Sequence, residues 1–120
     1  MSAQTNKAIV NRFFHEGLAA GDLGVFEEIL APDCTYHDAG RPAIENRADF
    51  IDYVGRVRAP LSRTDVMIHD LVAEGDRVAA RCTYSLENEE GQFDLAVMGI
   101  FRFGGDKIVQ IWRNVVLLAA

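Results

Sequence analysis

The segment Tyr36-His37-Asp38 combines three side chains that could take part in acid–base chemistry. A carboxylate at the rim of an apolar pocket has its pKa raised by desolvation, which suits removal of a proton beside a carbonyl group. A tyrosine hydroxyl can donate to a developing oxyanion. Because side chains alternate along a strand, His37 and Asp38 cannot both face inward without a bulge. We therefore expect Asp38 to be the base, Tyr36 to polarise the substrate, and His37 to have a structural or interface role.

Arg81 and Asn114 are the other predicted catalytic residues. A buried guanidinium needs a partner, and Arg81 could orient Asp38 or a substrate oxygen. A structural pair with Asp94 on the neighbouring strand is the open alternative. For Asp38, the alternative is a carboxylate that caps the loop before Pro42. Asn114 would be a neutral hydrogen-bonding group.

Three helices are predicted in the first half of the chain. Apolar residues at helical spacing indicate a helix over about residues 5–19. Asp22 can cap a short second helix, which Pro32 stops, and residues 34–37 are typical of a short strand. Asn46 opens a third helix in a pattern resembling a capping box.

The second half of the chain alternates between apolar and polar residues, which indicates strands. We predict strands near 64–73, 77–86, 92–103 and 107–118, separated by hairpin turns rich in glycine and aspartate. Helices followed by hairpins favour an α+β fold, with one domain over residues 1–120. We expect the fold to be cone-shaped. Its curved antiparallel sheet is a four-stranded meander and wraps around the N-terminal helix. The concave side of such a sheet would hold a closed, mostly apolar pocket.

Strand alternation predicts which side chains line this pocket. If the strands pair in sequence order, apolar and polar residues of one sheet face surround a shared hollow. Phe13 of the first helix would contribute to the same hollow. The predicted substrate-binding residues are Phe13, Thr83, Met98, Ile100 and Trp112, beside Arg81 and Asn114. Both faces of the last strand are apolar, so we also expect a second copy of the chain to cover one face. A monomer whose C-terminal residues cover the sheet is the alternative.

Composition excludes several classes of function. The net charge is −6 and no run of lysine or arginine occurs, which disfavours nucleic acid and anionic membranes as partners. We expect no signal peptide and no membrane span, and hence a cytoplasmic protein. Cys34 and Cys82 are expected to be free buried thiols, although spacing alone does not exclude a disulfide. The three histidines lack metal-ligand spacing, so no metal is expected. No glycine-rich phosphate loop occurs in the sequence, so no other cofactor is expected either.

Helix order, strand order and turns together resemble the SnoaL-like branch of the nuclear transport factor 2-like superfamily over essentially the whole chain. The segments that carry the resemblance are residues 7–14, 20–23, 30–36, 74–78, 99–103 and 106–109. The resemblance implies the fold and a pocket, but this fold hosts isomerases, cyclases, dehydratases, epoxide hydrolases and non-enzymes.

Three relatives can be matched residue by residue. Ketosteroid isomerases carry an aspartate base where this chain has Asp38, but Phe13 and Gly99 occupy their two oxyanion-hole positions. SnoaL-like polyketide cyclases carry an acidic residue on the last strand, where this chain has Arg113-Asn114.

Limonene-type epoxide hydrolases resemble the chain at Arg81, at Trp112-Arg113 and at Tyr36. Their two aspartates are replaced by Thr83 and Asn114. The resemblance therefore supports such an activity only if Asp38 substitutes for them.

The leading hypothesis is a cofactor-independent acid–base enzyme that performs isomerisation, aldol-type cyclisation or dehydration on a small apolar carbonyl compound. A non-catalytic ligand carrier, an epoxide hydrolase with a modified site, and an assembly module are the alternatives.

Overall fold

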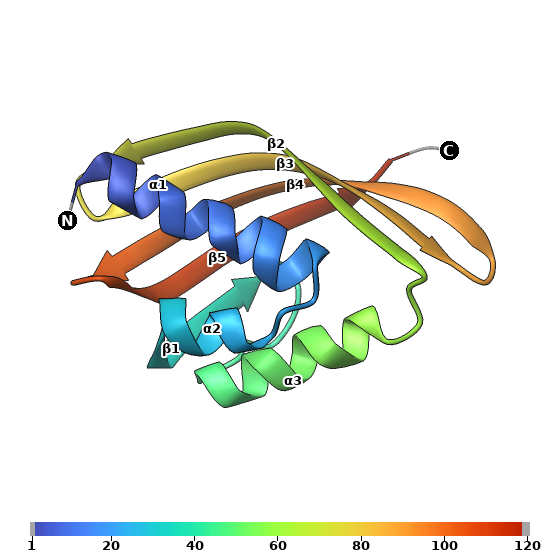
Figure 1. Cartoon of the computed structure of the whole chain (residues 1–120), viewed down its shortest axis with the longest axis horizontal. Coiled ribbons are helices and arrows are strands. Elements are labelled where there is room, and N and C mark those ends of the chain that lie inside the picture. The colour runs from blue at the N-terminus through green and yellow to red at the C-terminus, as the bar shows by residue number, and fades with distance from the viewer. Residues whose placement is uncertain (1, 119–120) are drawn as a thin grey trace.

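The computed structural model describes residues 2–118 and consists of helices packed on one face of a five-stranded sheet (Figure 1). The helical elements are α1 (Ala3–Arg12), the π-helix η1 (Phe13–Ala19), α2 (Gly24–Ile29) and α3 (Arg47–Arg58). The strands are β1 (Leu30–Asp38), β2 (Arg63–Glu74), β3 (Arg77–Asn88), β4 (Gly91–Gly104) and β5 (Lys107–Leu117). The predicted α+β class and the meander β2 to β5 are confirmed.

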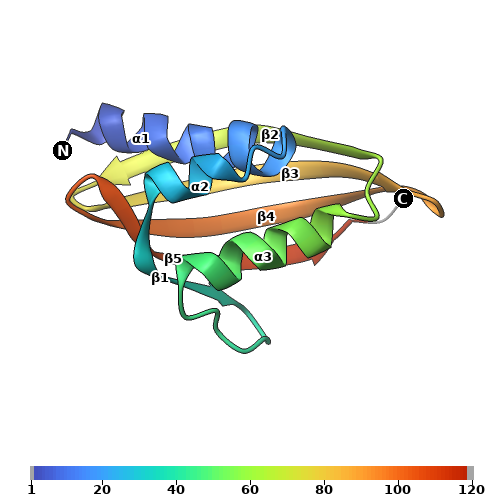
Figure 2. The same cartoon turned by 60° about the horizontal axis from the view of Figure 1, so that its bottom comes forward.

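The sheet order is β1-β5-β4-β3-β2, and it differs from the prediction at one edge. The strands β2 to β5 pair antiparallel, as expected, but β1 pairs with β5 in parallel. The sheet is therefore mixed rather than antiparallel, and β1 is longer than the predicted segment 34–37. It is curved and does not close into a barrel. Figure 2 shows α1, α2 and α3 together on one side of it.

Local sequence explains where most elements begin and end. The Asn46 side chain accepts a hydrogen bond from the Asp49 amide at 2.8 Å, so the predicted cap of α3 is confirmed. Gly75 and Gly105 form the hairpin turns at φ values of 57° and 63°, which favour glycine. In contrast, α2 begins after Leu23 without a side-chain cap, so the predicted capping by Asp22 is wrong.

The first helix continues into a π-helical turn, which the sequence pattern did not predict. A Cβ atom on Gly17 would lie 2.4 Å from the ring of Phe26, so this glycine lets α2 pack closely against η1. Phe13 and Phe14, both in η1, are buried and contact Phe101 of β4 edge to face. This aromatic core holds the helices against the concave face of the sheet, which we call the inner face.

Candidate active site

A buried ion pair joins the two strands at the β1 edge of the sheet. The parallel register places Asp38 beside Arg113, and both side chains face the helices. The guanidinium Nη2 of Arg113 donates to Oδ2 of Asp38 at 2.7 Å, and the two side chains are only 19% and 4% exposed. A charge-assisted bond of this length in a poorly solvated place holds both groups in one orientation.

Each partner of this ion pair retains one buried polar atom without a hydrogen-bond partner in residues 2–118. These atoms are Oδ1 of Asp38 and Nε of Arg113. Buried polar atoms in proteins are nearly always paired, so these two atoms mark positions that a ligand or a water molecule can complete. The pair thus offers one free acceptor and one free donor.

Three tyrosines surround the ion pair. Arg113 lies over the Tyr36 ring at 5.8 Å, and the rings of Tyr36 and Tyr53 are also 5.8 Å apart. Burial raises the pKa of the Tyr36 and Tyr84 phenols above their usual range, while Arg113 partly offsets the rise. Both phenols therefore stay protonated and can donate hydrogen bonds at neutral pH.

The same contacts keep Arg113 charged. Burial alone would lower the pKa of its guanidinium, but Tyr36 and the hydrogen bond to Asp38 outweigh that effect. Its pKa therefore lies above its ordinary value. The guanidinium therefore remains charged beside Asp38.

Three hollows meet around this cluster. A space of about 470 Å³ at the open end of the sheet has a largely apolar lining and includes Tyr84 and Arg113. It narrows to an inner space of about 30 Å³ among the core aromatics. A third hollow, a surface groove of about 700 Å³, contains Tyr36 and Asp38. Tyr53 lines all three hollows. Asp38 lines the surface groove and Arg113 lines the 470 Å³ space, so the ion pair separates these two hollows.

The space around the first helix is therefore not the closed pocket that the sequence suggested. Phe13 is 3% exposed and packs against other core rings rather than facing a large cavity. The remaining inner space is about the size of one water molecule. On the helix side of the sheet, the wider hollows on either side of the ion pair have room for a small ligand.

The predicted site residues divide between the two faces of the sheet. Tyr36 and Asp38 lie together on the inner face, as expected, and His37 faces away. The other predicted residues lie on the opposite side, which we call the outer face. They are Arg81, Thr83, Met98, Ile100, Trp112 and Asn114. Their grouping was predicted correctly from alternation, but the expectation that they share a hollow with Asp38 is wrong.

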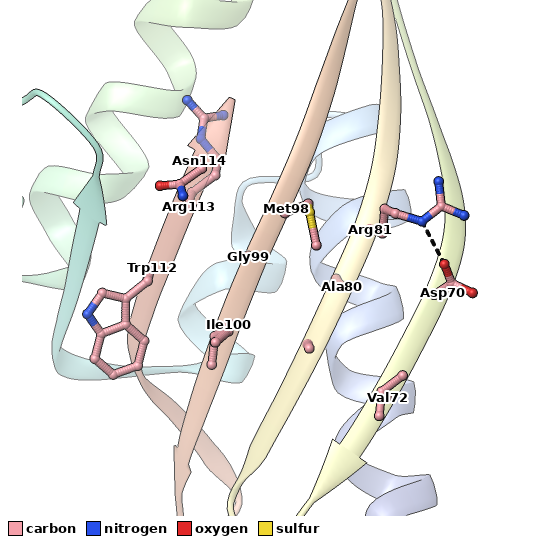
Figure 3. Close-up of a pocket in the computed structure, with 11 residues that line it drawn as sticks. Asp70, Val72, Ala80, Arg81, Met98, Gly99, Ile100, Trp112, Arg113 and Asn114 are labelled. Atoms are coloured by element: carbon pink, nitrogen blue, oxygen red, sulfur yellow. Dashed lines mark hydrogen bonds and ion pairs between the residues drawn. The ribbon is translucent and has the colours of Figure 1, made fainter. Parts of the chain in front are cut away.

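On the outer face these residues make different contacts from those expected. Arg81 pairs with Asp70 at 2.7 Å rather than with Asp38 or Asp94, and both side chains are about half exposed. Thr83 contacts His69 at 2.8 Å. Figure 3 shows this face with α1 behind the strands, and a hollow of about 500 Å³ lies on it.

Arg113, Tyr84 and Tyr53 also belong to the site, although none of them was predicted as a site residue from the sequence. A signal for Arg113 was present, because between Val109 and Leu117 it is the only charged residue on the face of the last strand that carries Ile111 and Val115. A lone arginine on an otherwise apolar strand face needs a buried carboxylate.

The described part of the chain offers no obvious metal site. Among residues 2–118, no group of three or more histidine, cysteine, aspartate or glutamate side chains could hold a metal ion. Cys34 and Cys82 are free and buried, so the expected thiols are confirmed. None of the helices between residues 2 and 118 has the length and apolar character needed to cross a membrane.

Comparison with known proteins places this fold in a family. The SnoaL-like domain family matches the chain over residues 10–111. No curated protein sequence matches the chain.

Solved structures share the fold at low identity. A candidate SnoaL-like polyketide cyclase from Jannaschia sp. CCS1 is 18% identical, with a TM-score of 0.85, covering 93% of this chain and 85% of its own. An LEH-like epoxide hydrolase from M. tuberculosis is 20% identical, with a TM-score of 0.79, over 91% and 80% of the two chains.

Wild-type IdmH from Streptomyces antibioticus, a candidate polyketide cyclase, is also 20% identical, with a TM-score of 0.79, covering 91% of this chain and 90% of that one. At these identities the likeness concerns the fold alone.

Proposed function

The chain belongs to the SnoaL-like domain family of the nuclear transport factor 2-like superfamily, and we propose that it is a cofactor-independent acid–base enzyme acting on a small, mostly apolar carbonyl compound. The observation that carries the proposal is the Asp38–Arg113 pair, which has one free acceptor and one free donor. A large apolar hollow beside it would hold the body of the substrate.

In the proposed reaction, Oδ1 of Asp38 removes a proton from the carbon next to the substrate carbonyl. Arg113 Nε and the phenol of Tyr36 or Tyr84 donate to the carbonyl oxygen as negative charge develops on it. The resulting enolate can be reprotonated elsewhere, attack a second carbonyl, or expel a hydroxyl group. These three outcomes correspond to isomerisation, aldol-type cyclisation and dehydration.

Arg81 and Asn114 have no part in this mechanism. Both lie on the outer face, separated from Asp38 by the sheet. The epoxide hydrolase alternative required Asp38 to act beside Arg81, in place of the two aspartates that Thr83 and Asn114 replace. Arg81 instead pairs with Asp70 on the outer face, away from Asp38. The inner site alone supplies one carboxylate and one arginine, which favours enolisation over the activation of water between two aspartates.

The proposal can be tested without knowing the natural substrate. Exchange of the α-protons of 2-decalone with D2O, followed by NMR, reports enolisation directly. We expect the wild-type protein to accelerate exchange and Asp38→Asn to lower that rate by about 10²- to 10⁴-fold. The matched control is Asp70→Asn, because Asp70 forms an arginine pair of the same length on the outer face.

An Asp38→Asn variant that keeps the wild-type exchange rate would refute the assignment of the base. If the wild-type protein binds the ketone but never accelerates exchange, the alternative of a non-catalytic small-molecule-binding protein is favoured. That alternative has one observation in its support, since Oδ2 of Asp38 is already engaged by Arg113 as in a structural ion pair.

The proposal extends to the protein's partner and location. Several large apolar side chains on the outer face are more than 40% exposed, which is typical of an interaction surface, and we propose that a second copy of the chain covers it. Sedimentation equilibrium over a range of concentrations tests this homodimer. Two free thiols are in keeping with the reducing cytoplasm, where we propose that the protein resides.

A further inference from the structure

The hollow of about 470 Å³ at the open end of the sheet has an excess of positive charge. Arg41, Arg58 and Arg113 line it, and no aspartate or glutamate among residues 2–118 does. The chain as a whole has the opposite bias, with 18 acidic residues and 12 basic ones. Arg113 is neutralised by Asp38. The unbalanced charge of the hollow is therefore that of Arg41 and Arg58.

Arg58 is held firmly at the wall of this hollow. It ends α3 beside the last turn of η1 (Figure 1). Its Nε donates to the Leu18 carbonyl oxygen at 2.9 Å, and its Nη2 donates to the Ala19 carbonyl oxygen at 3.1 Å. Its Nη1 lies against Gly21, where an added Cβ atom would come within 2.4 Å of it. These contacts fix the orientation of the guanidinium.

The two carbonyl groups do not balance the charge of Arg58. An arginine side chain has five N–H donors, and the bonds to η1 use two of them. Residues 2–118 form no ion pair with either Arg58 or Arg41. A half-buried guanidinium beside apolar side chains is expected to have an anionic partner. Arg58 therefore has both the free donors and the unbalanced charge to bind one.

The remainder of the hollow suits a hydrocarbon. Val57 on α3 is 46% exposed and Leu117 on β5 is 66% exposed, and both line the hollow. The other lining residues are mainly apolar as well. Ligand pockets of this size combine an apolar lining with a few polar groups that fix the orientation of the ligand.

The surface groove on the other side of the ion pair has the opposite character. Glu45, Asp49 and Asp52 line it beside Asp38. An anion would be attracted to the hollow and repelled from the groove. The two spaces therefore differ in the ligand that they favour.

From these observations we infer that the hollow binds an amphipathic anion, whose acid group lies against Arg58 and whose hydrocarbon body covers Val57 and Leu117. A carboxylate and a phosphate monoester are the acid groups that a guanidinium binds best. Arg41 is exposed, lines both the hollow and the groove, and adds attraction for the same charge. This inference rests on the proposed function in one respect, since it makes the substrate a carbonyl compound that also carries an acid group.

The acid group would lie well away from the reacting carbon. Arg58 follows Tyr53 by five residues, which is about 7.5 Å along the axis of α3. The Tyr53 ring is 5.8 Å from that of Tyr36, beside the ion pair. An extended chain advances about 1.2 Å per bond, so roughly six bonds would separate the carbonyl from the acid. This spacing also keeps the negative charge of the substrate away from Asp38.

Ligands without a ketone test the acid site apart from any reaction. Octanoate, octyl phosphate and 1-octanol have the same hydrocarbon chain, and amide chemical-shift titration of the ¹⁵N-labelled protein measures the dissociation constant of each. We expect at least one of the two acids to bind about tenfold or more tightly than 1-octanol, although the net charge of −6 opposes this preference. The acid that binds more tightly identifies the group. Equal affinity for all three compounds would refute the acid site.

Two substitutions separate the charge of Arg58 from its bonds to η1. Arg58→Gln removes the charge and should abolish the preference for the acid. Asn88→Asp places a carboxylate in the same hollow and keeps the oxygen that accepts the Glu90 amide at 2.9 Å. It should weaken octanoate binding by about three- to tenfold and leave 1-octanol unchanged.

Arg56→Gln is the control for both substitutions. Arg56 lies on α3 as well but lines the groove, so its removal should change neither affinity. If Asn88→Asp folds and retains the full preference for the acid, the assignment of the hollow is wrong, whatever the stability of Arg58→Gln.

Exchange of α-protons with D2O tests the inference for the proposed reaction. 7-Oxooctanoate has the spacing of six bonds, and its methyl ester differs only in lacking the charge. We expect kcat/KM to be about tenfold higher for the acid than for the ester. Arg58→Gln should remove this difference by raising KM for the acid while kcat is unchanged, because Arg58 is remote from the reacting carbon.

The two measurements distinguish the acid site from the proposed enzyme. Asp38→Asn should slow exchange without weakening octanoate binding. If octanoate binds through Arg58 but neither ketone exchanges faster than in buffer, the acid site stands and the proposed enzyme is refuted. If acid and ester exchange at the same enhanced rate, the enzyme stands and the acid site is refuted.

Discussion

Two aspartate–arginine pairs, one on each face of the sheet, have the same bond length and very different surroundings. Asp38–Arg113 and Asp70–Arg81 both span 2.7 Å. The inner pair is 4% and 19% exposed, whereas the outer pair is 55% and 54% exposed in the single chain. Burial rather than bond length therefore separates the pair that contains the proposed base from the pair that solvent screens.

The largest expected effect comes from removing the arginine of each pair. Arg113→Met leaves the Asp38 carboxylate buried without a counter-charge, which should lower the free energy of unfolding by about 3–5 kcal/mol. Arg81→Met should cost less than about 1 kcal/mol in the dissociated chain. Urea unfolding at pH 7 and low protein concentration measures both. Equal losses for the two variants would show that the burial difference has no energetic consequence.

Gly99 lies between the two regions and gives the next largest effect. It pairs with Arg113 across β4 and β5 and contributes to both the outer hollow and the inner space. A Cβ atom here would lie 2.9 Å from the Trp112 carbonyl oxygen, which is backbone and cannot yield cheaply. We expect Gly99→Ala to cost about 1–3 kcal/mol in urea unfolding and to slow enolisation by displacing Arg113.

Gly24→Ala is the control for this substitution. At Gly24 the nearest atom to an added Cβ is Asp22 Oδ1 at 3.4 Å, and the stability should be unchanged or slightly higher. If Gly99→Ala behaved in the same way, the two faces would not be coupled through the backbone at this position.

Alkaline pH should weaken the inner side of the sheet selectively, since every tyrosine of the chain packs there. Burial raises the pKa of Tyr36 and Tyr84, so folding keeps them protonated where the unfolded chain ionises. The two phenols contribute fully to the free energy of unfolding below pH ~10. Above that pH the free energy of unfolding falls by about 1.4 kcal/mol per pH unit for each phenol.

Two thiols contribute to the same alkaline loss. Burial also raises the pKa of Cys34 to about 12 and that of Cys82 to about 11. Urea unfolding between pH 9 and 11 should therefore show a falling free energy, and Tyr84→Phe should make the fall above pH 10 shallower. An unchanged slope in that variant would mean that Tyr84 ionises as easily in the folded protein as in the unfolded one.

The fold followed closely from the sequence, because its signals are local. Turn glycines, the Asn46 cap and period-two alternation fixed the elements, and alternation sorted β3 and β4 correctly into two faces. The parallel pairing of β1 with β5 depends on residues more than 70 positions apart, so no local pattern reports it.

The site was harder to predict, because alternation divides a strand into two faces without saying which one meets the helices. The chosen face contained Arg81, Met98 and Asn114, which look like a polar-lined pocket in the sequence. The helices instead cover the more apolar face, and Arg113 is carried inward with it. Register shifts add to the difficulty, since the irregularity near Val109 leaves both Ile108 and Ile111 buried.

The smallest effect concerns the outer pair and depends on whether a second copy covers it. A double-mutant cycle with Asp70→Asn and Arg81→Gln should give a coupling free energy of about 0.2–1 kcal/mol in the dissociated chain, and 1 M salt should remove most of it. When the proposed dimer forms, the pair loses solvent, so its coupling should become stronger and less sensitive to salt. Cycles measured at protein concentrations below and above the dimer dissociation constant test this. A coupling that is the same at both concentrations would mean that the outer pair stays in solvent, and that the second copy does not cover this part of the face.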